Sequence, residues 1–153
     1  MAILEAAILF DSATLVERKY YDSEQVLNKE HRVGLLAAID GFAREAFGDE
    51  ISSFSLASYT LIVTSINVPQ PKMEQNVKKL MMYAIVQKGM SEVVVKENMD
   101  KILDQFLNRF SKFELFNLND KIIKKMQKFD SRIDEQFKDL ALKPEDRFKK
   151  IFF

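Results

Sequence analysis

The chain of 153 residues contains no cysteine, one histidine, three prolines and four glycines. Without cysteine there can be no disulfide, no thiol catalysis and no cysteine-based zinc site. His31 has no second histidine or cysteine with which to complete a metal or catalytic site. The four glycines match neither a P-loop nor a dinucleotide-binding fingerprint. We therefore predict a chain with no catalytic residue, no metal ligand and no cofactor.

An excess of charge of one sign is also missing, because 23 basic and 23 acidic residues cancel. No global charge favours nucleic acid, and none is predicted as a partner. The charges are unevenly spread, however: residues 1–111 hold 12 basic and 15 acidic side chains, whereas residues 112–153 hold 11 and 8. The opposite signs of these two parts indicate two structural units.

Long hydrophobic runs are absent as well. No stretch approaches the roughly 20 apolar residues that a membrane-spanning helix needs. The apolar residues 1–10 include Glu5 and lack a basic leader, which argues against a signal peptide. The sequence predicts a soluble, cytoplasmic protein.

The hydrophobic residues, 47% of the chain, are grouped in two kinds of pattern. Short apolar or β-branched segments predict five strands, at 3–10, 14–21, 51–57, 59–66 and 80–86. The last of these is an almost unbroken apolar run, which is typical of a central strand covered on both faces. Two prolines in 68–71 predict a loop between the fourth and fifth strands.

Helical spacing of apolar residues predicts three helices. The first spans about 29–48, and the second begins after Ser91 as its cap and reaches about residue 110. In the third, from Leu115 to Leu140, apolar residues recur in steps of three and four with an eleven-residue repeat, which favours one nearly straight helix. We predict a single dry core beneath the first helix, which includes Leu36, Ile39, Phe42, Ile85 and Phe106.

The predicted fold class is α+β: a five-stranded antiparallel sheet flanked by helices, in the order β-β-α-β-β-β-α-α. This order resembles that of the longin domain. The segments that carry the resemblance are AILFD at 7–11, LVER at 15–18, GLLAAI at 34–39 with Phe42 and Phe47-Gly48, MYAIV at 82–86 and KILDQF at 101–106. The likeness covers residues 3–112. The related roadblock fold begins with an additional helix, for which no room exists before Ile3.

The resemblance implies a longin-like domain at 1–112. It also implies a helical C-terminal extension at 113–153, made of the last longin helix and a short amphipathic end. Arg132 lies off the apolar stripe of that extension, which argues against a SNARE coiled coil. The stripe either folds back on the sheet or projects to a partner.

In function, the resemblance implies a non-catalytic protein–protein interaction module in membrane trafficking or small-GTPase regulation. Its partners would be a small GTPase, a subunit of a trafficking complex, or a second copy in a homodimer. The alternative is a small sensor domain with a ligand pocket between sheet and helix, since related sheet-and-helix folds also serve as sensors.

Two surfaces are candidates for interaction. Gly34 and Gly41 share a helix face with Ala38, and each glycine within a helix costs about 0.5–1 kcal/mol relative to alanine. Close packing on the domain's own sheet or close approach by a partner would compensate for this cost. Phe148, Ile151 and Phe152 share a second apolar face among basic residues. That face could dock on its own domain, in a partner's groove, or transiently on an anionic membrane.

Overall fold

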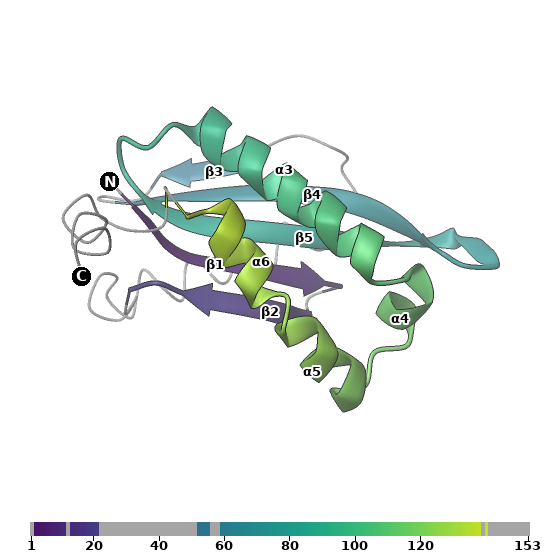
Figure 1. The fold of residues 1–153 in the computed structure, drawn as a ribbon. Coiled ribbons are helices and arrows are strands. Elements are labelled where there is room, and N and C mark those ends of the chain that lie inside the picture. The colour runs from purple at the N-terminus through teal and green to yellow at the C-terminus, as the bar shows by residue number, and fades with distance from the viewer. Residues whose placement is uncertain (1, 12, 22–51, 56–58, 139, 141–153) are drawn as a thin grey trace.

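The computed structural model describes residues 2–11, 13–21, 52–55, 59–138 and 140. Its strands form one antiparallel sheet in the order β2-β1-β5-β4-β3 (Figure 1). The strands are β1 (Ile3–Phe10), β2 (Ala13–Lys19), β3 (Ser52–Ser55), β4 (Tyr59–Gln70) and β5 (Met73–Gln87). The predicted α+β class and antiparallel sheet are confirmed. The helix predicted at 29–48 lies outside the described residues.

The centre of the sheet is formed by β1 and β5, which pair with each other and with β2 and β4 respectively. The apolar run of β5 explains its central place, because its alternating side chains enter two separate apolar clusters. Leu80 and Met82 belong to one, Met81 and Tyr83 to the other. The prediction of a central strand at 80–86 is confirmed.

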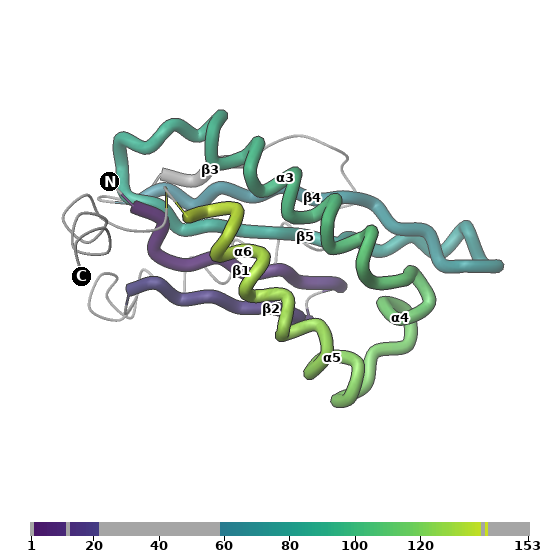
Figure 2. The backbone as a smooth tube through the Cα atoms, in the orientation of Figure 1, coloured from purple at the N-terminus to yellow at the C-terminus, as the bar shows by residue number. Residues whose placement is uncertain are grey.

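The loop predicted at 68–71 is wrong in its extent. β4 continues to Gln70, a tight turn follows at Pro71 and Lys72, and β5 begins at Met73 rather than Leu80. Pro69 is accommodated because the register shifts between it and Gln70, and an irregularity tolerates the missing amide donor. The result is a long hairpin that extends beyond the neighbouring strands (Figures 1 and 2).

The described helices pack on one face of the sheet. Helix α3 (Glu92–Arg109) begins at Ser91, whose hydroxyl accepts a hydrogen bond from the backbone N–H of Val94, as predicted for a cap. It crosses in front of β4 and β5, and α6 (Asp130–Gln136) lies in front of β1 and β2 (Figure 1). Their apolar faces share a single core cluster with one face of the sheet.

The single straight helix predicted over 115–140 is wrong, because three short helices occupy this segment: α4 (Lys112–Phe116), α5 (Asp120–Gln127) and α6. Asn119 has extended backbone angles that end any continuous helix, and its side chain caps α5 at Ile122 N–H. Between α5 and α6 the chain tightens, since the N–H of Phe129 bonds to Met126 O, three residues earlier.

Breaking the helix leaves its apolar stripe intact. Leu115, Met126, Phe129, Ile133 and Phe137 are all buried in the core shared with the sheet. The stripe therefore folds back on the sheet, which was one of the two outcomes left open by the sequence. The N–H of Ile3 also donates to the carbonyl of Leu140 at 2.9 Å, joining this segment to the start of β1.

Of the predicted core residues, Ile85 and Phe106 are confirmed as fully buried. They belong to two separate clusters, because the sheet has an apolar cluster on each face, so the prediction of a single core is wrong. Leu36, Ile39 and Phe42 lie outside the described residues, so their burial stays a prediction. Phe106 stands at the centre of an aromatic cluster, with ring centroids 4.8 Å from Phe110 and 5.2 Å from Phe129. This cluster sets the spacing between α3 and the α5–α6 segment.

Candidate functional site

The six residues proposed from the sequence as interaction surfaces all lie outside the described residues. They are Gly34, Ala38, Gly41, Phe148, Ile151 and Phe152. Their role stays a prediction, and the candidate sites below belong to the part of the chain that the structure describes.

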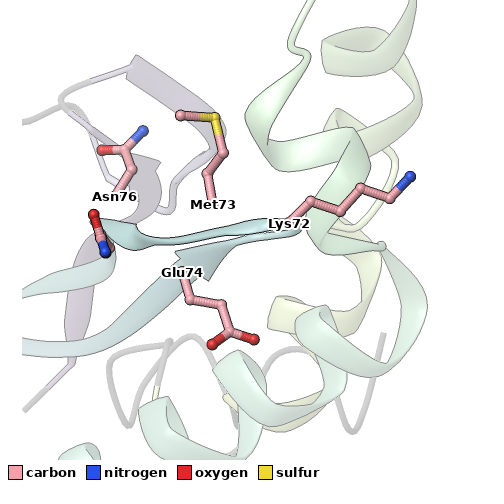
Figure 3. A pocket seen from close by; sticks show the side chains of 5 residues that line it. Lys72, Met73, Glu74 and Asn76 are labelled. Carbon is pink, nitrogen blue, oxygen red and sulfur yellow. The ribbon is translucent and has the colours of Figure 1, made fainter.

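One hollow lies at the tip of the β4–β5 hairpin and is lined by Lys72, Met73, Glu74, Gln75 and Asn76. All five residues follow one another at the tip of one hairpin, Lys72 in the turn and the other four at the start of β5, so no other element lines the space. Figure 3 shows Met73 and Glu74 pointing to opposite sides of the hairpin and Lys72 extending away from it. Ligand sites are normally concave and bury most of their ligand, and this tip lacks such walls.

A second hollow is a groove between α3 and the start of α6, with a volume of about 420 Å³. One wall is formed by Gln105, Asn108 and Arg109 of α3. Arg132 of α6 and Phe129, from the turn before it, complete the lining. Because two separate elements build it, this groove is the stronger candidate for a binding site.

The groove has a rigid frame. The buried ring of Phe129 packs edge-on against Phe106 of α3. Along the same pair of helices the side chain of Gln136 donates to Asn98 at 2.7 Å. Pre-formed walls lower the entropic cost of binding, because little must be ordered when a ligand arrives.

Positive charge dominates the groove. No carboxylate in the described segments lies within ion-pair distance of Arg109 or Arg132. The Arg109 guanidinium lies 5.8 Å from the ring centroid of Phe110, a cation–π contact that uses none of its N–H donors. Both guanidinium groups therefore keep their donors for an external acceptor.

The basic character continues beyond the groove. Lys121, Lys125, Lys128 and Arg132 follow one another in steps of four, three and four residues. This is the spacing of the buried apolar stripe, displaced by one position, so these charges follow one side of the α5–α6 segment. Lys125 is paired with Glu114 at 2.8 Å.

A carboxylate joins β2 to α6 on the other side of the segment. Asp134 accepts hydrogen bonds from the Tyr20 hydroxyl at 2.7 Å and from Nε of Arg18 at 2.8 Å. Burial, together with the bond to Asp134, raises the pKa of Tyr20 far above its ordinary range, so the phenol stays protonated. The hydrogen bond to Asp134 likewise raises the pKa of Arg18. Because these hydrogen bonds join the end of β2 to α6, we call the cluster of Arg18, Tyr20 and Asp134 the clamp.

A buried carboxylate lies on the face of the sheet that carries the second apolar cluster. Glu5 of β1 is 1% exposed and accepts a hydrogen bond from the Tyr83 hydroxyl at 3.1 Å. Lys19 Nζ lies 3.9 Å from its other oxygen. Contacts from the two flanking strands, β2 and β5, thus compensate part of the cost of burying a charge.

Other kinds of site are not seen in the described ranges. They contain no group of three or more His, Cys, Asp or Glu side chains that could hold a metal ion. None of the helices described is both long enough and apolar enough to cross a membrane.

Comparison with known proteins adds no assignment. Neither protein-family models nor curated proteins match this chain. The groove therefore has to be interpreted from its own chemistry.

Sequence reasoning missed Gln105, Asn108, Arg109 and Arg132 as members of one site. The basic spacing from Lys121 to Arg132 was a visible signal, as was the place of Gln105 and Asn108 on the polar side of a predicted helix. Nothing in the sequence indicates that Arg109 and Arg132 line the same groove, because this depends on how α3 and α6 cross the sheet.

Proposed function

We propose that the chain is a non-catalytic protein–protein interaction module of the longin type. It acts in a membrane-trafficking or small-GTPase regulatory assembly in the cytoplasm, touching membranes only peripherally. The fold agrees with this for the elements described: an antiparallel sheet carries α3 and the C-terminal helices on one face. Because fold alone does not fix function, the proposal depends on the site.

The observation that carries the proposal is the position of the groove between α3 and α6. The groove opens on the outer side of the helices, lined mostly by exposed polar side chains. The interior between the sheet and the helices that the structure describes is filled by fully buried side chains such as Ile102, Phe106 and Met82. A sensor needs an internal apolar pocket with convergent polar groups. An outer groove over a filled core favours recognition of another protein's surface.

The rigid frame of the groove also supports a role in docking another protein. Asp134 ties α6 to β2, and Gln136 ties it to α3. Interfaces of pre-organised modules change little on binding. A partner would therefore meet a groove whose walls are already formed.

The test is cross-linking of the full chain, tagged and purified under native conditions, followed by mass spectrometry of the linked peptides. We expect links to one protein, or to a second copy, from lysines near the groove such as Lys101, Lys124 and Lys128. The identified protein must then bind the purified chain in the absence of other components. If the chain forms no complex and is instead stabilised by a small molecule, the sensor alternative replaces the proposal.

A further inference from the structure

We infer that the groove between α3 and α6 binds an acidic, extended peptide segment of a protein partner. Arg109 and Arg132 hold its carboxylates, and Gln105 and Asn108 hold its backbone. This inference depends on the proposed function, because it specifies the chemistry of the partner that the interaction module recognises.

The two arginines supply the charge selectivity. A guanidinium presents a rigid fork of donors that matches a carboxylate bidentately, and such charge-assisted bonds are stronger than neutral ones. Arg109 comes from one wall and Arg132 from the other, and neither is neutralised by a carboxylate of the described chain. A ligand with acidic groups could therefore bridge the two helices.

The amide side chains distinguish a peptide from a simple anion. Asparagine and glutamine each offer a donor and an acceptor, as a peptide backbone does, whereas a phosphate group at neutral pH offers mainly acceptors. Asn108 makes no hydrogen bond to other described residues through its side chain, and Gln105 makes only a long one, 3.5 Å to Gln136. Both keep bonding capacity for a backbone.

The extent of the positive charge favours an extended segment. Lys121 and Lys128 continue the line of charge from Arg132 along α5, and neither is paired in the described chain. The nearest acidic side chains in sequence are Asp104, next to Gln105, and Asp130 and Asp134, on either side of Arg132. None of the three lines the groove. Several acidic residues in a row would meet several basic ones.

A membrane fits this surface less well. The exposed large hydrophobic side chains of the described residues are Met73, Val77, Val93, Val94 and Phe113, and none of them lines the groove. An interfacial membrane site combines basic residues with exposed apolar ones that enter the headgroup region. In this groove the charges surround a concave space of a size suited to side chains.

The test measures binding of a short fluorescein-labelled peptide of alternating Glu and Ser to the full chain by fluorescence anisotropy. The control probe is the same peptide with Gln in place of Glu. The double variant Arg109→Glu/Arg132→Glu is compared with Lys72→Glu/Lys88→Glu, which changes the net charge equally but lies outside the groove. Circular dichroism and melting temperature establish that both variants fold.

We expect saturable binding of the acidic probe, no binding of the Gln probe, and a loss of about tenfold or more in affinity only in the groove variant. Arg109→Gln/Arg132→Gln should show the same loss if charge reversal impairs folding. Equal losses in both charge-reversal variants would reveal general electrostatic attraction and overturn the inference. So would the absence of saturable binding at millimolar protein, or tighter groove-dependent binding of inorganic phosphate or phosphatidylserine vesicles.

The two proposals can fail separately. If the groove variant retains every cross-linked partner of the wild-type chain, the interaction module stands and the acidic-peptide groove does not. If the wild-type chain binds the acidic probe through the groove but has no protein partner, the groove stands as an anion site and the proposed function fails.

Discussion

The hydroxyl of Tyr20 donates a 2.7 Å hydrogen bond to Asp134, which lies 114 residues later in the chain. Arg18 donates to the same carboxylate oxygen at 2.8 Å. One side chain of α6 thereby fastens the edge of the sheet at β2 to the helical segment that also forms the groove. Because α6 also lines the groove, loss of this clamp would change the position of one wall of the groove.

The clamp predicts an unusual response to alkaline pH. Tyr20→Phe should cost about 1–3 kcal/mol at neutral pH, because Asp134 loses one of its donors. In the wild-type chain, burial and the bond to Asp134 raise the pKa of Tyr20 above its ordinary value of 10.0. The native state therefore keeps a proton that the unfolded state releases. This contribution is complete below about pH 10 and is lost as the pH rises further.

Urea midpoints of wild-type and Tyr20→Phe chains between roughly pH 8 and pH 11 check this. Above pH 10 the wild-type advantage should shrink by up to about 1.4 kcal/mol per pH unit. Other titrating groups are common to both proteins and cancel in the difference. A difference that stays constant over the whole range would contradict the clamp.

The contacts of Glu114 predict that the stability of the protein depends on pH in acid. Its carboxylate bonds Lys125 and completes a capping box with Ser111 at the start of α4. The bond from Lys125, followed by the backbone N–H of Ser111, lowers the pKa of Glu114 below its ordinary value of 4.5. Stability from this group is complete above that value and is lost as the pH falls through the lowered pKa.

We therefore expect Glu114→Gln to lower the free energy of unfolding at neutral pH by no more than about 1 kcal/mol. The gap should narrow as the pH falls below 4.5 and close below the lowered pKa of Glu114. Glu74→Gln at the exposed hairpin tip is the matched control and should have no measurable effect at neutral pH. A gap that persists in acid would show that packing of the side chain, and not its charge, is responsible.

Two phenylalanines separated by a few residues test the core. Phe106 is 0% exposed and Phe113 is 68% exposed. Phe106→Ala should cost about 3–5 kcal/mol through lost burial and the cavity left behind, whereas Phe113→Ala should stay within about 0.5 kcal/mol of wild type. Chemical denaturation of both variants measures this. Similar losses at the two positions would mean that the side chain of Phe113 is buried in solution and that α4 packs with a different face on the core.

Ile133 tests whether the apolar stripe of the C-terminal helices docks on the sheet in solution. Its side chain is fully buried, so Ile133→Ala should lower the free energy of unfolding by about 2–5 kcal/mol. Glu135→Ala, on the exposed side of the same helix, is the control. If the stripe instead served a partner, Ile133→Ala would leave the isolated chain as stable as wild type and reduce only its complex formation.

Hydrophobic pattern predicted the strands and helices that bury apolar residues, and it failed where structure does not depend on burial. The run at 80–86 identified the central strand, but residues 73–79 of the same strand are mostly polar. They are held by their pairing with β4 in the hairpin. A hydrophobic pattern does not reveal such pairing. The breaks in the last helix were equally invisible to periodicity, because the apolar steps continue through Asn119 unchanged. The usable signal was Asn119, a residue type favoured at helix N-caps, which caps α5.

The groove could be recognised only from the tertiary structure. Arg109 ends one helix and Arg132 belongs to another, and each taken alone resembles an ordinary exposed charge. Their convergence follows from the packing of Phe129 against Phe106, which brings α3 and α6 together. A line of four basic residues along one side could be seen in advance, but the wall opposite it could not.

The inner position of β1 has a consequence for how a new chain matures on the ribosome. β1 and β2 can form a hairpin as soon as both have emerged, within microseconds. The other edge of β1 must wait for β5, since Ile8 lies opposite Met82. During that interval an apolar strand edge is exposed, and such edges readily pair with other chains. Nascent chains should therefore aggregate most readily, and depend most on chaperones, before Gln87 has left the exit tunnel.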